Sequence, residues 1–374
     1  ERLLILMKKI NTSKKIIDII VGTRPNFVKV ASLYGELNKN KKIYKNIQFR
    51  LIHTGQHYNK NLSSNFFIEL KIPEPDYNLA IGSGSHVFQT ANIMLAYEKI
   101  LKNKLPYLCI VVGDVNSTMA CAIAVKKFNI KIAHIEAGLR SGDLKMPEEI
   151  NRIVTDSITD IFFTTSKFAN QNLLRNGIRK KDIHFVGNTM IDTLKNNLLN
   201  LKKPKIWDVY NLCKKSYIII TLHRPSNVDE VENLSNLLKI LSKARNEKFI
   251  FPVHPRTKLK LKFIKKIYKN VILTNPLSYL QFNYLLKYSK AVITDSGGIT
   301  EEATFFNIPC LTLRDTTERP ETVILGSNKL IGNNYLDLIK NIKKINSNKW
   351  KVSKIPEKWD GNSAKRILKI LSQA

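Results

Sequence analysis

The stretch Asp295-Ser296-Gly297-Gly298-Ile299-Thr300-Glu301-Glu302 decides how the chain is interpreted. It follows the apolar run 291–294, typical of a buried strand, and precedes residues 303–306, which continue as a helix. Strand, glycine turn and helix start are therefore predicted. A helix N-terminus carries unpaired N–H groups and about half a positive charge, and glycines let that backbone close on a phosphate. Glu301 and Glu302 lie one turn later, where a carboxylate can reach a ribose diol. Alone, the pattern also fits an ordinary capped helix, so its partners along the chain decide.

Apolar runs alternate with amphipathic segments on both sides of this stretch, which predicts parallel sheets covered by helices. The first half has strand candidates at 16–21, 49–54, 107–112, 130–135, 161–165 and 183–186. The second half has them at 217–221, 249–253, 271–274, 291–294, 310–313 and 329–331. Residues 196–216 are a plausible linker. The expected fold class is α/β, with two Rossmann-like, doubly wound domains that bind ligands in a cleft at their strand ends.

Composition limits the classes of function. The chain has 374 residues, 43% of them hydrophobic, and a formal net charge of +31. Such a charge suggests nucleic acid or anionic lipid, but the lysines are spread along the whole chain, which favours a compositional bias over a binding patch. No apolar run reaches the roughly 18 residues of a membrane span, and the N-terminal apolar patch precedes its lysines, the reverse of a signal peptide. A cytoplasmic protein without a membrane segment is expected.

Polar residues gather where the strands of the first half end. The first strand ends in Gly22-Thr23-Arg24-Pro25, with Lys29 one turn into the following helix. Arg24 and Lys29 are candidate anion partners, or else a surface pair. The third strand ends in Gly113-Asp114, where the aspartate is either a helix cap or a cleft carboxylate.

Two further carboxylates follow the fourth strand. Glu136, at the end of a buried strand, needs a function or a cation. Glu148 and Arg152 are four residues apart on a helix that begins at Pro147, so a surface ion pair is the simpler explanation for them.

The second half adds His223-Arg224 at a strand end and Arg319 within the charged segment 314–321. His223 suits a phosphate or an acid/base role, although a single histidine is more often structural. There is no H-E-x-x-H, EF-hand or G-x-S-x-G pattern. The residues therefore predict an enzyme without metal or other cofactor that acts on a ligand carrying a diphosphate.

Seven segments, taken together and in order, resemble the non-hydrolysing UDP-N-acetylglucosamine 2-epimerases over about residues 16–370. They are Gly22-Thr23-Arg24-Pro25, His53-Thr54-Gly55-Gln56-His57, Gly113-Asp114, His134-Ile135-Glu136-Ala137-Gly138-Leu139-Arg140, Pro147-Glu148-Glu149-Ile150-Asn151-Arg152, Asp295-Ser296-Gly297-Gly298 and Thr316-Thr317-Glu318-Arg319-Pro320-Glu321.

This resemblance implies a glycosyltransferase-B-type fold whose last helix returns to the first lobe. The expected domains are 1–195, completed by 360–374, and 196–359. It also implies interconversion of UDP-N-acetylglucosamine and UDP-N-acetylmannosamine by elimination of UDP, through 2-acetamidoglucal, in a homodimeric enzyme that serves polysaccharide biosynthesis. By motif, the acid/base residues are Asp114, Glu136, Glu148 and His223. The substrate contacts are Arg24, Lys29, Arg152, Ser296, Gly297, Gly298, Glu302 and Arg319.

Three features depart from the family pattern. Many members have Glu-Ala where this chain has Asn26-Phe27. Gln56, His57 and His254 resemble part of the activator site of some bacterial members, but residues 78–86 contain no matching arginine. Relatives that act on UDP-2,3-diacetamido-2,3-dideoxyglucuronate have Trp where this chain has Arg319-Pro320, so UDP-N-acetylglucosamine is the favoured substrate.

Other functions stay open at this point. They are epimerisation of the diacetamido-uronate, a hydrolysing epimerase that releases N-acetylmannosamine and UDP, and a retaining sugar transferase of the same fold. A basic nucleic-acid-binding protein is a different class, supported only by the net charge and opposed by the absence of an aromatic RNA-binding signature or a helix-turn-helix.

Overall fold

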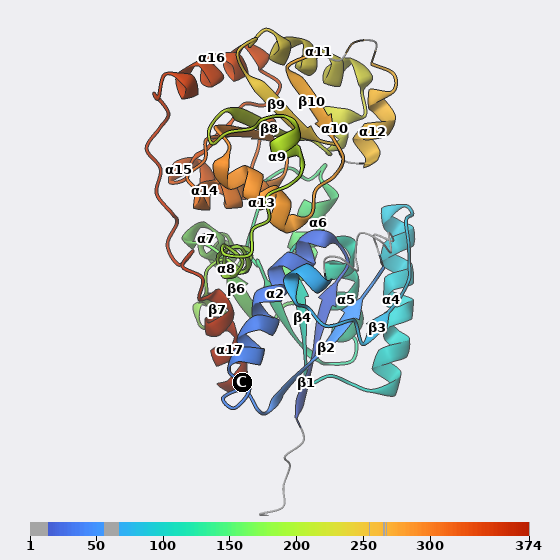
Figure 1. Ribbon diagram of the computed structural model, residues 1–374. Coiled ribbons are helices and arrows are strands. Elements are labelled where there is room, and N and C mark those ends of the chain that lie inside the picture. Colours follow the sequence, from blue (N-terminus) through green and yellow to red (C-terminus); the bar gives the residue numbers. More distant parts are fainter. Residues whose placement is uncertain (1–13, 56–66, 254, 265, 267, 374) are drawn as a thin grey trace, which may run out of the picture. The chain divides into compact units, whose positions relative to one another are not determined.

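The computed structural model describes residues 14–55, 67–253, 255–264, 266 and 268–373. This part of the chain forms two parallel sheets, each covered by helices (Figure 1). It divides into two compact units. Unit 1 comprises the chain up to Gly138, Leu144–Thr189 and the chain from Asn362 onward; unit 2 comprises Leu139–Asp143 and Met190–Gly361.

The sheet of unit 1 has the strand order β3-β2-β1-β4-β5-β6-β7, and all of its neighbouring strands are parallel. From β1 the chain moves outward through β2 to β3, and it then crosses over to β4 on the other side of β1. The order therefore reverses between β1 and β4, which is where doubly wound sheets bind ligands. The strands are β1 (Lys15–Val21), β2 (Ile47–His53), β3 (Tyr77–Asn78), β4 (Leu108–Val112), β5 (Lys131–Ile135), β6 (Ile161–Thr164) and β7 (Ile183–Phe185).

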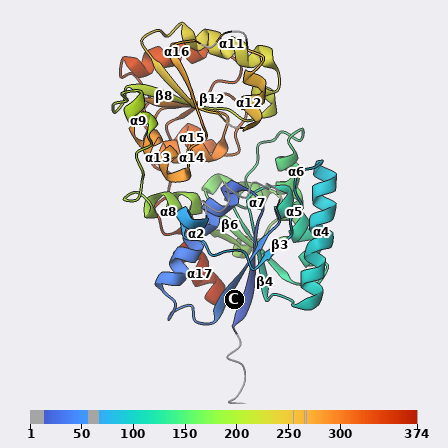
Figure 2. The same cartoon turned by 45° about the vertical axis from the view of Figure 1, so that its right-hand side comes forward.

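Helices cover both faces of this sheet. On one face α4, α5 and α6 lie side by side, and on the other α17 packs along α2 (Figure 1, Figure 2). The C-terminal helix is also tied to the sheet, since Arg366 Nη1 donates to the carbonyl of Val186 at 2.9 Å. The helices are α2 (Arg24–Lys39), α4 (His86–Asn103), α5 (Asn116–Lys126), α6 (Pro147–Ile158), α7 (Lys167–Arg175), the short 3-10 helix η1 (Lys180–Asp182) and α17 (Ser363–Gln373).

Unit 2 repeats this plan with the order β10-β9-β8-β11-β12-β13, again all parallel, so its reversal lies between β8 and β11. The strands are β8 (Tyr217–Thr221), β9 (Lys248–Pro252), β10 (Val271–Thr274), β11 (Ala291–Thr294), β12 (Cys310–Thr312) and β13 (Asn328–Leu330). One face packs on α11 and α16, the other on α13 and α14, in two separate apolar clusters.

Helices α13 and α16 of unit 2 begin at side-chain caps. In α13, for example, Ser278 and Gln281 form a reciprocal capping box, which satisfies two N–H groups at the helix start. The helices are α9 (Ile206–Val209), α10 (Pro225–Val228), α11 (Val231–Ser242), α12 (Pro255–Leu261), α13 (Tyr279–Tyr288), α14 (Gly297–Phe305), α15 (Pro320–Ile324) and α16 (Tyr335–Asn346). Helix α8 (Thr189–Asn196) has its first residue in unit 1 and its other residues in unit 2.

The predicted α/β class is confirmed, and each of the twelve apolar runs overlaps an observed strand. Among the strands in the described ranges, β3 is the one that the sequence did not predict. Tyr77 and Asn78 are both exposed, so this two-residue edge strand has no buried apolar pattern that could have signalled it.

Candidate active site

The turn after β1 is fixed to the end of β4. Gly22 lies so close to α5 that a Cβ atom there would be 2.0 Å from Ser117 Oγ. Asn26 Oδ1 accepts hydrogen bonds from the N–H groups of Gly22 and Thr23 at 3.1 and 3.0 Å, and its Nδ2 donates to the carbonyl of Val112 at 3.0 Å. Asn26, one of the departures from the family pattern, therefore joins the two loops at the strand-order reversal.

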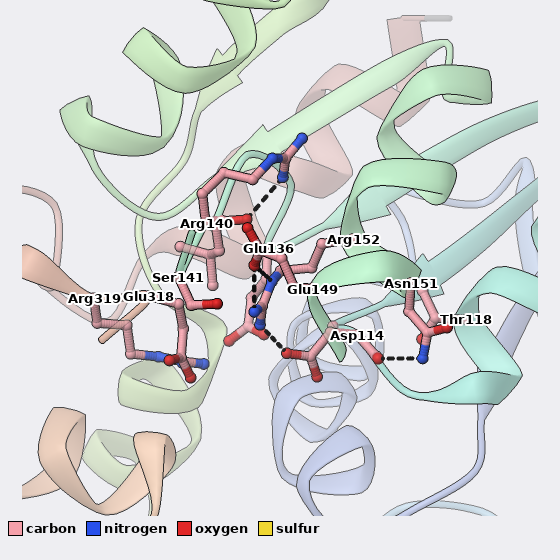
Figure 3. A network of polar contacts seen from close by, with 12 residues as sticks. Asp114, Thr118, Glu136, Arg140, Ser141, Glu149, Asn151, Arg152, Glu318 and Arg319 are labelled. Carbon is pink, nitrogen blue, oxygen red and sulfur yellow. Dashed lines mark hydrogen bonds and ion pairs between the residues drawn. The ribbon is translucent and has the colours of Figure 1, made fainter. Parts of the chain in front are cut away.

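Asp114 follows β4 and is held by Arg152 of α6 (Figure 3). Arg152 Nη1 lies 2.5 Å from Asp114 Oδ2, and its Nε and Nη2 bind Glu149 Oε2 at 3.0 and 2.6 Å. Arg152 and Glu149 are buried, whereas the Asp114 side chain is 23% exposed. Asn151 Nδ2 also donates to the carbonyl of Asp114 at 2.9 Å. The structure thus fixes a carboxylate that stays open to solvent.

The helix spacing suggested a different partner for Arg152. The sequence offered Glu148, four residues away, but Arg152 binds Glu149, three residues away. Glu148 is half-buried in the first turn of α6 and has no hydrogen bond or ion pair with any residue that the structure describes. The proposed surface pair is therefore absent from this part of the chain, and Glu149 is a buried carboxylate that sequence reasoning missed.

Glu136 forms a buried ion pair with Lys29 of α2. Glu136 has φ +71°, a left-handed conformation that costs a non-glycine residue about 1–2 kcal/mol. Gly113 also has positive φ, and a Cβ there would lie 3.0 Å from Lys29 Nζ. The end of β4, the end of β5 and α2 thus converge on this pair. Lys29, predicted as an anion partner, is the counter-ion of Glu136 in this structure.

Arg24 is the first residue of α2 and is half-buried. Burial lowers the pKa of its guanidinium below the usual range, and the nearby Glu69 carboxylate opposes that shift. The predicted anion partner therefore stands at a helix N-terminus, where backbone N–H groups also favour an anion.

In unit 2, His223 follows β8 and Asp295 follows β11, so both stand at the strand-order reversal. His223 Nδ1 lies 2.9 Å from Asp295 Oδ1, and the histidine side chain is 45% exposed while the aspartate is buried. Asp295 also accepts hydrogen bonds from the N–H groups of His223 and Arg224 and from Asn227 Nδ2. Burial alone would raise the pKa of Asp295. The hydrogen bonds of its carboxylate outweigh burial and lower the pKa, and the largest of these effects comes from the side chain of His223. Asp295 therefore orients the imidazole of His223 by its contact with the Nδ1 atom.

The glycine turn begins α14, with Ser296 as its N-cap residue. A Cβ at Gly297 would lie 2.7 Å from both Arg319 Nη1 and Glu318 Oε1, and a Cβ at Gly298 would lie 2.8 Å from Met190 Cε. At Gly297 a side chain would therefore collide with the buried Arg319–Glu318 pair, whereas at Gly298 the near atom is the flexible end of a methionine that can shift.

Buried charged side chains next to this turn form a series of ion pairs. Arg319 Nε binds Glu301 Oε1 at 2.5 Å, Arg319 Nη1 binds Glu318 Oε1, and Arg314 Nη2 binds Glu318 Oε2 at 2.8 Å. The order is Glu301, Arg319, Glu318 and Arg314, so negative and positive side chains alternate. The sequence offered Glu301 as a possible ribose contact, and in the structure it pairs with Arg319. Sequence reasoning did not single out Glu318, although the density of charges in 314–321 was the available signal.

Glu302, the predicted ribose contact, is buried in α14 beside α13. Burial raises the pKa of its carboxyl to about 7, against the lowering effect of hydrogen bonds with Asn283 and Tyr279. Asn283 Nδ2 is 3.3 Å from Glu302 Oε1. This carboxyl is therefore poised to gain or lose a proton near neutral pH.

The remaining predictions concern absent features or a separate site. Gln56, His57 and His254, compared with an activator site, lie outside the described residues. Among the residues that are described, no three His, Cys, Asp or Glu side chains form a group able to hold a metal ion. No helix in the described ranges is both long and apolar enough to cross a membrane.

Comparison with known proteins gives consistent matches along the chain. The family model described as UDP-N-acetylglucosamine 2-epimerase matches residues 39–372. A UDP-N-acetylglucosamine 2-epimerase homolog of Methanococcus maripaludis is 48% identical over 87% of this chain and 91% of its own length. The UDP-2,3-diacetamido-2,3-dideoxy-D-glucuronate 2-epimerase of Pseudomonas aeruginosa is 37% identical over 84% of this chain and 87% of its own.

A crystal structure provides a match of the same kind. The UDP-GlcNAc 2-epimerase of Methanocaldococcus jannaschii, solved in complex with UDP-GlcNAc and UDP, superposes with a TM-score of 0.87 at 41% sequence identity. The match covers 96% of this chain and 100% of that one.

Proposed function

Because the chain belongs to the UDP-N-acetylglucosamine 2-epimerase family and is therefore an isomerase, we propose that it interconverts UDP-N-acetylglucosamine and UDP-N-acetylmannosamine without hydrolysis. The similar enzyme of Methanocaldococcus jannaschii was crystallised with UDP-GlcNAc and UDP, which supports this nucleotide sugar as the substrate. The observation that carries the proposal is that Asp114 and Glu136, each paired with a cation, end the adjacent parallel strands β4 and β5.

Unit 2 is proposed to bind the UDP part. The N-terminus of α14, at Ser296, Gly297 and Gly298, presents backbone N–H groups to the diphosphate. Glu302 accepts hydrogen bonds from the ribose hydroxyls. Arg319 is held between Glu301 and Glu318. It lies close to Gly297 and adds positive charge near the turn.

Unit 1 is proposed to supply the acid/base groups. One carboxylate removes the proton from C2, the C1–O bond to UDP breaks with its electron pair leaving on UDP, and a C1=C2 double bond forms in 2-acetamidoglucal. UDP then adds back to C1 while a proton reaches C2 from the opposite face. Two groups are needed, one for each face, and Asp114, Glu136 and Glu148 are the candidates.

The ion pairs suit this chemistry. Arg152 and Lys29 each place a positive charge against a proposed acid/base carboxylate and hold it in position. His223 and Arg24 are proposed to stabilise the charge that develops on the departing diphosphate. Asp295 fixes the imidazole of His223 through its Nδ1 atom, and the histidine side chain stays 45% exposed.

A product assay separates this function from its alternatives. The protein is incubated with UDP-N-acetylglucosamine, and the products are separated by anion-exchange chromatography. UDP-N-acetylmannosamine supports the proposal, whereas N-acetylmannosamine with UDP identifies a hydrolysing epimerase. Since the Pseudomonas aeruginosa relative acts on a diacetamido-uronate, turnover of that substrate alone would reassign the specificity.

We further propose a cytoplasmic homodimer whose product, an activated sugar, is used in polysaccharide biosynthesis. Phe88 and Leu95 of α4 are seven residues apart, so they share one helix face, and they are 50% and 60% exposed. Exposed apolar faces of this kind commonly mark interfaces. Light scattering of the purified protein should give twice the chain mass, and Leu95→Glu should give a monomer. A wild-type monomer would contradict the proposal.

A further inference from the structure

His134 is a polar residue in the middle of the first sheet. It lies in β5 with Val111 of β4 and Phe162 of β6 as its neighbours, and it is completely buried. The centre of a parallel sheet is normally apolar, and a polar side chain is tolerated there only when its hydrogen bonds are satisfied.

Both ring nitrogens of His134 have partners. Nε2 lies 2.8 Å from the carbonyl oxygen of Gly113, and Nδ1 lies 2.8 Å from Asp156 Oδ1 of α6. A carbonyl oxygen can only accept, so Nε2 must carry a hydrogen and donate it. This holds whether the second proton of the pair lies on Nδ1 or on Asp156.

Asp156 extends the connection to a second loop. Its Oδ2 accepts a hydrogen bond from the N–H of Gly138 at 3.1 Å. Gly113 directly precedes Asp114, and Gly138 follows Glu136 by two residues. Gly113, Glu136 and Gly138 all have positive φ, so both loops hold conformations that the backbone does not favour. One buried pair therefore reaches the loops of two proposed acid/base residues.

We propose that His134 and Asp156 are positioning residues that fix the loops of Asp114 and Glu136 relative to each other. This inference rests on the proposed function for the roles of those two carboxylates. Neither His134 nor Asp156 is exposed to solvent by more than 3%, so they act through the two loops and not on the substrate. A displacement of about 1 Å in a reacting group can reduce turnover about 100-fold.

The central test compares Asp156→Ala with Asp156→Asn. Alanine removes both acceptors, so kcat should fall about 100-fold while the Kd for UDP stays within threefold, because none of the proposed UDP contacts lies in either of the two loops. Asparagine keeps the connection, since its Oδ1 can accept from Gly138 and its Nδ2 can donate to a neutral His134 whose Nε2 still donates to Gly113. It should recover most of the lost kcat.

Asp18→Ala is the matched control. Asp18 is equally buried in the same sheet, where its carboxylate binds Arg50 at 2.6 and 2.8 Å, but it has no contact with either loop in the interactions described. It should lower the melting temperature and leave kcat within threefold at a temperature where every variant is folded. The proposal is overturned if folded Asp156→Ala has the kcat of Asp18→Ala, or if Asp156→Asn is as slow as Asp156→Ala.

Hydrogen exchange tests the same proposal without turnover. Asp156→Ala should speed exchange at least tenfold in peptides covering both 112–116 and 135–139, while Asp18→Ala should not. Acceleration confined to 135–139 would show that the two loops are not linked, and would overturn the proposal. If the wild-type protein lacks epimerase activity but Asp156→Ala still speeds exchange in both peptides, the proposed function is rejected and the link between the loops is kept.

Discussion

The guanidinium of Arg152 lies 2.5 Å from the carboxylate of Asp114, and the same guanidinium binds Glu149 through two further nitrogens. A buried cation thus fixes a partly exposed carboxylate at the end of β4. The position of Asp114, a proposed acid/base residue, therefore depends on this contact.

Asp114→Asn should reduce kcat by about 10²- to 10⁴-fold, since an amide cannot take a proton from C2. The Kd for UDP, measured by calorimetry, should not change. Asp208→Asn is the matched control, because Asp208 is exposed and forms a surface ion pair with Lys203. Wild-type turnover in a folded Asp114→Asn protein removes Asp114 from the mechanism.

Arg152→Met should lower the free energy of unfolding by about 3–5 kcal/mol, because it leaves the buried Glu149 without its cation. Arg179→Met removes an ion pair of the same spacing, to Asp182, but Arg179 is 70% exposed. That control should cost no more than about 1 kcal/mol. Urea denaturation followed by circular dichroism measures both, and equal losses would refute the account of the buried cluster.

Gly298→Val should abolish UDP binding in a protein that remains folded. Its Cβ would lie 2.8 Å from Met190 Cε, a flexible end that can shift, so the fold survives but the turn is blocked. Gly35→Ala in α2 is the control, since a Cβ there meets nothing within 4 Å. Unchanged UDP affinity in folded Gly298→Val would reject α14 as the phosphate site.

Glu302→Gln should change how stability depends on pH. Burial raises the Glu302 pKa from 4.5 to about 7, so between these values the folded chain holds a proton that the unfolded chain has lost. The contribution of Glu302 to the free energy of unfolding therefore falls as the pH rises from about 4.5 to 7, and it is constant above pH 7. Glutamine removes this loss, so at pH 8 the variant should be more stable by roughly 3 kcal/mol, the equivalent of a shift from 4.5 to about 7.

The control for this prediction is Glu232→Gln, an exposed glutamate of α11. Its stability should follow that of the wild type at every pH. Thermal unfolding between pH 4.5 and 8 makes the comparison, and identical pH profiles for the two variants would show that Glu302 does not carry the buried proton.

The sequence was sufficient for the sheets because buried parallel strands are short apolar runs, and those runs coincide with the strands. It was insufficient for side-chain partners. Helix spacing made Glu148 and Glu149 nearly equivalent neighbours of Arg152, and the choice depends on Asp114, 38 residues earlier in the chain. The positive φ of Glu136 had no signal either, because glutamate is not a residue that predicts it. The roles of the site residues and the domain limits 1–195, 196–359 and 360–374 stay predictions.

The most direct test of the central claim is proton NMR of the wild-type protein with UDP-N-acetylglucosamine in heavy water. Elimination and re-addition of UDP predict UDP-N-acetylmannosamine with deuterium at C2, because the proton that returns to C2 comes from a group in exchange with solvent. UDP-N-acetylmannosamine that keeps its original C2 proton would contradict that route, and free N-acetylmannosamine with UDP would contradict a non-hydrolysing enzyme.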